Sequence, residues 1–221
     1  HVKTAAIESI RNNDSHYAPQ KGKLELRQAI SNYLKKATGV VYDPETEIVV
    51  TVGATEAINA TLFSITNRGD KVAIPTPVFS LYWPVATLAD ADYVLMNTSE
   101  DNFKLTPERL ESTLKEESNI KAVILNYPVN PTGVEYTESE IRALAEVIKA
   151  HNLYVITDEI YSTLTYGVKH FSIASVIPER AIYISGLSKS HAMTGYRLGY
   201  VAGPAKIMEQ IGKVHGLMVT T

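Results

Sequence analysis

Short apolar runs alternate with longer segments of helical periodicity from residue 48 to the end of the chain. Several of these runs are almost continuously apolar, as is typical of strands that are covered on both faces of a mainly parallel sheet. The alternation predicts an α/β fold in which helices cover both faces of a mostly parallel, seven-stranded sheet. The predicted strands are Ile48–Val52, Lys71–Ile74, Tyr93–Met96, Ala122–Asn126, Tyr154–Asp158, Ala181–Ser185 and Leu198–Ala202.

Helical patterns fill most of the gaps between these strands. The clearest covers Thr137–Ala150, where Thr137 and Glu140 have the spacing of a capping box. Thr106 followed by Pro107 marks the start of another helix, because proline is favoured at the first helical position. The remaining helices predicted between strands are Thr55–Ile65 and Ser80–Leu88.

The first 47 residues have a different organisation. They contain an amphipathic helix, a polar loop from Asn12 to Gly22 and a second helix, Leu24–Lys36. We expect residues 1–47 to form the N-terminal helical part of a large domain and residues 48–221 to form its α/β part. The apolar face of the first helix consists of Val2, Ala6, Ile7 and Ile10.

The composition excludes several classes of protein. The net charge is −3 with both signs interspersed, so nothing resembles the basic stripe of a nucleic-acid binder or a polybasic membrane patch. No apolar run approaches the roughly 20 residues that cross a bilayer. The chain has no cysteine, which excludes disulfides and thiolate chemistry and fits a reducing cytoplasm.

Ligands of open α/β sheets bind beyond the carboxyl ends of the strands, so polar residues at these ends are candidates for a site. Gly53, Ala54 and Thr55 follow the first strand and lead into a helix. A turn of small residues at a helix N-terminus presents free N–H groups that suit a phosphate. The alternative is that Thr55 simply caps the helix.

Two further strands end in polar segments. Asn130 lies in a rigid turn that contains Pro131 and Gly133, which would hold its amide in one place for a ligand; the alternative is a structural turn. Asp158 ends an apolar strand, where a carboxylate is costly unless a cation meets it. A protonated pyridine nitrogen would be such a cation, and the alternatives are a helix cap or an ion pair.

The sixth strand is followed by a Ser/Gly-rich turn that carries Lys189, and Arg197 stands eight residues later between small residues. A lysine in such a turn can form a Schiff base, and an arginine can bind phosphate oxygens with two parallel hydrogen bonds. The alternative is that both are solvated cations of a loop.

With these residues in order, the sequence resembles the class I/II aminotransferases of the aspartate aminotransferase superfamily. The segments that carry the resemblance are Gly53–Thr55, Asn130–Gly133, Asp158–Tyr161 and Ser185–Gly199. Two shorter stretches, Tyr17–Gly22 and His191–Gly195, are similar to the bacterial and archaeal aspartate, aromatic and acetyl-diaminopimelate branch. The resemblance implies the large domain of a PLP-dependent transferase, where PLP is pyridoxal 5'-phosphate. It also implies transfer of an amino group between an amino acid and a 2-oxo acid such as 2-oxoglutarate.

The resemblance also implies roles for individual residues. Lys189 would hold PLP as a Schiff base and move protons, and Asp158 would pair with the ring nitrogen. Tyr161 and Asn130 would hydrogen-bond the phenolic oxygen, and Phe79 would stack on the ring. Residues implied for the phosphate are Gly53, Ala54, Thr55, Arg197 and Ser188, or alternatively Ser185.

Tyr17 matches a tyrosine that reaches the phosphate of the neighbouring subunit, so the resemblance implies a homodimer. It also places a small domain with a substrate-binding arginine beyond Thr221 and an N-terminal arm before His1, so we expect this chain alone to be inactive. No metal, nucleic acid or membrane partner is expected. Two other functions remain open on the same residues, a PLP-dependent C–S β-lyase and a PLP-sensing regulator domain.

Overall fold

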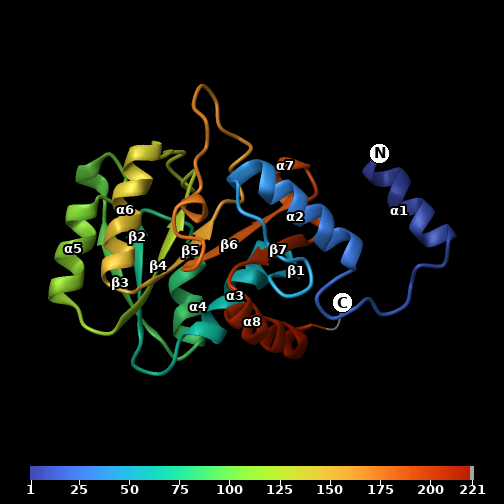
Figure 1. Cartoon of the computed structure of the whole chain (residues 1–221), viewed down its shortest axis with the longest axis horizontal. Helices are drawn as coiled ribbons and strands as arrows, with labels where there is room; N and C mark the ends of the chain where they lie inside the picture. The colour runs from blue at the N-terminus through green and yellow to red at the C-terminus, as the bar shows by residue number, and fades with distance from the viewer. Residues whose placement is uncertain (220–221) are drawn as a thin grey trace.

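A seven-stranded sheet forms the centre of the molecule (Figure 1), for which the computed structural model describes residues 1–219. The strand order is β1-β7-β6-β5-β4-β2-β3, and β7 runs opposite to the other six strands. The mostly parallel sheet is therefore confirmed, and each predicted strand is present with at most two added residues at an end. The strands are β1 Ile48–Val52, β2 Lys71–Thr76, β3 Asp92–Asn97, β4 Ile120–Asn126, β5 Tyr154–Asp158, β6 Ala181–Gly186 and β7 Leu198–Ala202.

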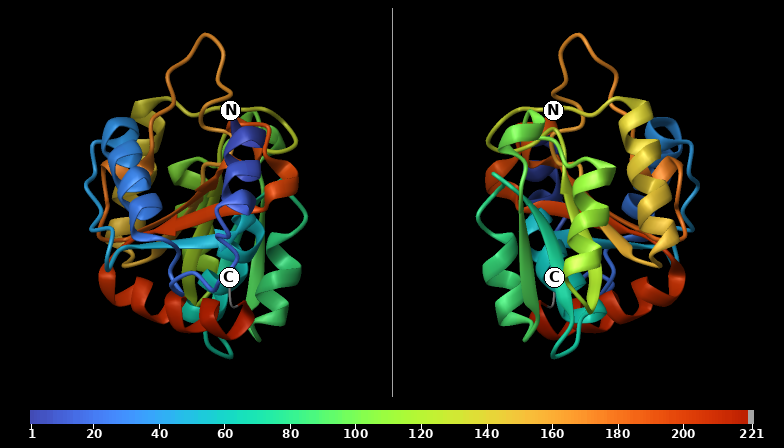
Figure 2. Two further views of the ribbon diagram at one scale, coloured as in Figure 1. Left: turned by 90° about the vertical axis from the view of Figure 1, so that its right-hand side faces the viewer. Right: turned by 90° about the vertical axis from the view of Figure 1, so that its left-hand side faces the viewer.

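Helices cover both faces of this sheet, as predicted. Buried residues of α3, α4 and α8 form one apolar cluster, and those of α2, α5 and α6 form a second cluster on the opposite face (Figure 2). The helices are α1 Val2–Arg11, α2 Leu24–Thr38, α3 Gly53–Ile65, α4 Tyr82–Leu88, α5 Pro107–Glu116, α6 Glu138–Ala150, α7 Leu187–Ser190 and α8 Ala205–Met218. Three short 3-10 turns are η1 Ser99–Asp101, η2 Ile173–Ser175 and η3 Thr194–Tyr196.

The predicted helix starts at Thr137 and Thr106 are confirmed by their capping bonds, whereas α3 begins at Gly53 and not at Thr55, and α4 begins at Tyr82 and not at Ser80. Thr137 accepts a hydrogen bond from the N–H of Glu140 at 3.3 Å, and the Glu140 carboxylate accepts one from the N–H of Thr137 at 2.7 Å. Thr106 accepts a hydrogen bond from the N–H of Arg109 at 3.2 Å, with Pro107 at the first helical position. These bonds satisfy N–H groups that a helix start leaves free, which explains why the local sequence defines these boundaries well.

Helix α1 stands apart from the body of the molecule and is joined to α2 by an extended loop (Figure 1). The expected helix is present, but none of its residues is buried, and Ile10 is 79% exposed. Its apolar face is thus uncovered within residues 1–219. No helix in this range is long and apolar enough to cross a membrane.

Candidate active site

A cavity of about 250 Å³ lies beyond the carboxyl ends of β4, β5 and β6. Side chains from widely separated segments line it, including most of those singled out in the sequence. The predicted site residues on its wall are Ala54, Thr55, Phe79, Asn130, Asp158, Tyr161, Ser188, Lys189 and Arg197. The expectation that polar residues at strand ends converge on one ligand site therefore agrees with the geometry.

Asp158 is the buried charge of this cavity, with only 3% of its surface exposed. Its carboxylate accepts hydrogen bonds from the Tyr82 hydroxyl at 2.8 Å and from the N–H of Ile160 at 3.2 Å. Burial raises the pKa of Asp158 to about 6, although these two hydrogen bonds oppose the shift. Such a shift corresponds to about 3 kcal/mol against the charged form, so a cation arriving at this carboxylate would be stabilised.

Tyr82 and Asn126 belong to the site but were not predicted from the sequence. Burial, the largest cause, together with the charge of Asp158 raises the pKa of Tyr82 well above its usual value, so its hydroxyl remains a donor. The Asn126 side chain donates to the carbonyl oxygen of Asp158 at 3.0 Å and accepts from the N–H of Asn130 at 2.9 Å. Two signals could have found them: Tyr82 is an aromatic residue three positions after Phe79, and Asn126 is a polar residue that ends an apolar strand.

The Phe79 ring contacts Tyr82 edge-on, with 6.1 Å between ring centroids. Phe79 lines the cavity together with Tyr82, whose hydroxyl donates to Asp158. A flat aromatic ligand that pairs with Asp158 would thus lie beside the Phe79 ring. Aromatic rings attract one another in offset or edge-on arrangements.

Lys189 lies in the short helix α7, directly after β6, and its Nζ is 5.7 Å from the centroid of the Tyr161 ring. The structure brings this amine from α7 and the Asp158 carboxylate from β5 to the same cavity. An amine and a buried carboxylate in one cavity suit a ligand that carries a carbonyl group at one end and a basic nitrogen at the other.

A third corner of the cavity is built for an anion. The N-terminus of α3 begins at Gly53, which has a φ of +72°, and the guanidinium group of Arg197 packs so closely that a Cβ at Gly53 would collide with it. A Cβ at Gly199 would collide with the backbone of Gly53 and Ala54. Gly53 and Gly199 thus allow Arg197, which directly precedes β7, to lie against the N-terminus of α3. Free N–H groups and the helix dipole attract negative charge there.

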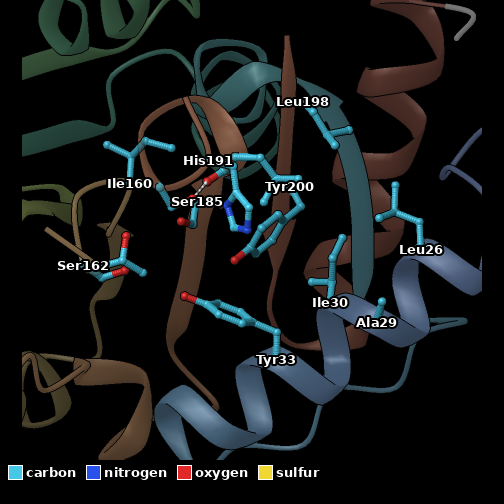
Figure 3. Close-up of a pocket in the computed structure, with 14 residues that line it drawn as sticks. Leu26, Ala29, Ile30, Tyr33, Ile160, Ser162, Ser185, His191, Leu198 and Tyr200 are labelled. Atoms are coloured by element: carbon cyan, nitrogen blue, oxygen red, sulfur yellow. Dashed lines mark hydrogen bonds between the residues drawn. The ribbon is translucent and has the colours of Figure 1, made fainter. Parts of the chain in front are cut away.

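Three predicted residues, Gly53, Ser185 and Tyr17, are not part of the wall of this cavity, although Gly53 packs against Arg197, which lines it. The hydroxyl of Ser185 donates to the backbone carbonyl of Glu159 at 3.3 Å and faces a second cavity on the other side of β6 (Figure 3). In this second cavity, Tyr33 of α2 and Tyr200 of β7 direct their hydroxyls inward. Of the two serines considered for the phosphate, only Ser188 lines the first cavity. Tyr17 is 85% exposed on the loop after α1.

A mostly parallel sheet with a lysine, a buried carboxylate and an anion cradle around one cavity defines an α/β protein suited to a flat, phosphorylated ligand. Comparison with known proteins gives the family. The aminotransferase class I and II family model matches residues 1–221. This chain belongs to that family.

Among curated relatives, a probable N-acetyl-LL-diaminopimelate aminotransferase of Bacillus subtilis is 45% identical over 215 residues, which cover 97% of this chain and 54% of that protein. Among solved structures, an aromatic aminotransferase of Pyrococcus horikoshii has a TM-score of 0.94 at 40% identity, over 97% of this chain and 58% of that one. The aspartate aminotransferase of Thermus thermophilus with maleate has a TM-score of 0.96 at 34% identity, over 100% of this chain and 57% of that one. The chain thus spans little more than half the length of these relatives.

Proposed function

We propose that the protein is a PLP-dependent aminotransferase and that the cavity beyond β4, β5 and β6 binds PLP. The observation that carries the proposal is the buried Asp158 carboxylate, which shares one cavity with Lys189 and with the Arg197 cradle. These groups fit the basic nitrogen, the carbonyl and the phosphate of PLP, respectively. When bound, PLP supplies an electron-accepting ring that stabilises the negative charge left on a substrate carbon.

The polar residues on the cavity wall would orient the ring. Asp158 would accept a hydrogen bond from the protonated ring nitrogen, and Tyr82 would hold that carboxylate in place. Asn130 and Tyr161 would donate to the phenolic oxygen, which favours its anionic form. Phe79 would cover one ring face and exclude water from it.

The phosphate would bind at the start of α3. Gly53, Ala54 and Thr55 would donate their backbone N–H groups, with the Thr55 hydroxyl as a further donor. Arg197 would neutralise part of the charge with two parallel hydrogen bonds, and Ser188 would donate from the lysine segment. Ser185 is not part of this proposal, because its hydroxyl is bonded to a carbonyl oxygen away from the cavity.

Lys189 would hold the cofactor covalently and then act as acid and base. Its amine would take up and return a proton at the substrate Cα. Substrate would be an amino acid of the aspartate, aromatic or acetyl-diaminopimelate type, with a 2-oxo acid such as 2-oxoglutarate as amino acceptor. The names of the relatives support this choice over a C–S lyase or a regulator.

We propose three further properties of the protein that carries this chain. Residues 1–47 would belong to the same large domain as residues 48–221, of which residues 220 and 221 lie outside the described range. The protein would be a homodimer in which Tyr17 reaches the phosphate of the second copy, which is supported by the exposure of Tyr17 and of the nearby α1 face. It would act in the cytoplasm. Light scattering and cell fractionation test the last two properties.

The decisive experiment is to replace the lysine. With PLP, the intact wild-type protein should gain a visible absorbance band that borohydride traps as a covalent adduct, and Lys189→Ala should lose both. Amino-group transfer to 2-oxoglutarate should fall by more than about a hundredfold in the variant, as expected when a general acid–base group is removed. A covalent adduct on Lys189→Ala, or unchanged transfer, would contradict the assignment. Release of pyruvate in place of transfer would indicate the lyase.

A further inference from the structure

A second buried carboxylate lies directly beside Asp158. Glu159 has no exposed surface, and its Oε1 accepts hydrogen bonds from the Ser172 hydroxyl at 2.6 Å and the Thr157 hydroxyl at 2.8 Å. A third hydroxyl, that of Tyr127, donates to the same oxygen at 3.3 Å. Tyr127 packs in the apolar cluster under α2, α5 and α6, whereas Tyr82, the partner of Asp158, packs in the cluster under α3 and α4. The two neighbouring carboxylates therefore point to opposite faces of the sheet.

The remaining partner of Glu159 is His170, which lies between two carboxylates. Its Nε2 is 2.7 Å from Glu159 Oε2, and its Nδ1 is 3.2 Å from Glu135 Oε2. An ionised carboxylate only accepts, so with Glu135 and Glu159 both ionised the two ring nitrogens of His170 donate, which only the imidazolium form does. Burial opposes this form, but the hydrogen bonds to Glu135 and Glu159 outweigh it and raise the pKa of His170 to about 9.

This bridge joins the two segments that carry the ring-binding side chains. Glu159 lies between Asp158 and Ile160 in the segment that ends with Tyr161, and Glu135 lies five residues after Asn130. The His170 ring also stacks at a tilt on Tyr127, with 5.1 Å between centroids, and Tyr127 precedes the Asn130 turn. The two segments are thus fastened to one cation at the face of the sheet opposite the cavity.

We propose that His170 is a positioning residue of the cofactor cavity. Its cation holds the Glu159 and Glu135 segments at a fixed separation, so that Asn130, Tyr161 and Asp158 keep the spacing that the ring would need. His170 itself touches no ligand. This inference rests on the proposed function, because it concerns how the same cavity binds PLP.

The test compares charge with packing. In the intact, cofactor-free protein, we expect His170→Gln to raise the dissociation constant of PLP by about tenfold, because Glu159 then stays buried without its cation. The double variant Glu159→Gln/His170→Gln removes the uncompensated charge as well, and should recover to within about threefold of the wild type. PLP titration by absorbance, with circular dichroism to verify folding, measures both constants.

His151→Gln is the matched control, since His151 pairs with Glu111 at 3.1 Å on the exposed surface. It should bind PLP like the wild type. A His170→Gln constant within twofold of the wild type overturns the proposal and leaves the proposed function intact. A double variant no better than His170→Gln also overturns it, because the effect would then come from packing and not from charge. A wild-type protein that binds no PLP overturns both proposals.

Glu135→Gln gives an independent measurement in case His170→Gln does not fold. It leaves the Glu159–His170 pair in place and weakens only the attachment to the Asn130 segment. The dissociation constant of PLP should rise about threefold, because only the hydrogen bond between His170 and residue 135 is weakened. An unchanged constant would contradict the bridge between the two segments.

Discussion

Asp158 and Glu159 are adjacent, both are buried, and the protein treats them in opposite ways. Glu159 accepts hydrogen bonds from three hydroxyls and from the His170 cation. Asp158 accepts two neutral hydrogen bonds and forms no ion pair within residues 1–219. The comparison shows that this fold compensates a carboxylate fully on one face of the sheet and only partly on the other.

The difference has a physical consequence for function. A fully compensated carboxylate stabilises the loops around it but has little left to offer a ligand. A partly compensated one carries an energetic cost in the free protein, and this cost is released when a cation binds. The raised pKa of Asp158 is the sign of that cost, and it lies on the face where the cavity opens.

Among the variants of the two carboxylate networks, Asp158→Asn should have the largest effect, because it removes the partly compensated charge itself. If the proposed function holds, amino-group transfer should fall by more than about a hundredfold, since the ring nitrogen of PLP would lose its charged partner. The cofactor-free protein should instead become more stable by about 2–3 kcal/mol near pH 7, because a buried, partly compensated charge is removed. The folded pKa of about 6 lies above the usual 3.8, so ionisation costs the wild type stability as pH rises through this window.

Urea unfolding at pH 4 and pH 7 tests this prediction. The stability gain of Asp158→Asn should be present at pH 7 and shrink toward pH 4, where the wild-type carboxyl is protonated in the folded state and about half protonated in the unfolded state. A variant that is less stable than the wild type at pH 7 would show that Asp158 is already compensated in the free protein.

His170→Gln should have the opposite effect on stability. The folded pKa of about 9 lies above the usual 6.5, so the imidazolium stabilises the fold fully below pH 6.5, and this contribution is lost as pH rises toward 9. The contribution is about 3 kcal/mol at its maximum. The variant should therefore be much less stable than the wild type at pH 6 and similar to it above pH 9. Denaturant midpoints across this range measure the difference, and a pH-independent loss would mean that the imidazole acts by packing alone.

Tyr82→Phe should sharpen the comparison by making Asp158 still less compensated. The lost hydroxyl donates at 2.8 Å, so the pKa of Asp158 should rise further and the folded protein should lose about 1 kcal/mol. Adding Asp158→Asn to this variant should remove most of the pH dependence between pH 4 and pH 7. If Tyr82→Phe leaves the pH dependence of unfolding unchanged, the hydroxyl does not control the carboxyl.

The sequence predicted those features that depend on local periodicity and on a general rule of α/β folds. The strands, the caps at Thr106 and Thr137 and the convergence of Asp158 and Lys189 belong to this group. The cap signals work because both partners lie within one helical turn. The convergence works because the carboxyl ends of parallel strands meet at one edge of the sheet.

The features that the sequence did not reveal depend on contacts between distant residues. Tyr82 bonds Asp158 across 76 positions, and His170 joins Glu159 to Glu135, which lies 35 positions before it. Ser185 was considered for the phosphate, but side chains alternate across a strand, and only the fold shows which face it takes. The exposure of the apolar face of α1 could not be predicted either. The sequence pattern shows that this helix is amphipathic but not what packs against it.

The smallest effect is expected where the same pair of residue types is exposed. His151 and Glu111 lie 3.1 Å apart, between the 2.7 Å and 3.2 Å of the two His170 pairs, but about a third of each side chain is open to solvent. His151→Gln should change the free energy of unfolding by less than about 0.5 kcal/mol, because water screens such a pair and hydrates both partners when it is broken. Unfolding measured beside His170→Gln at pH 6 makes the comparison direct. If His151→Gln loses as much free energy of unfolding as His170→Gln, the distance between the charges sets the strength of these pairs, and their burial does not.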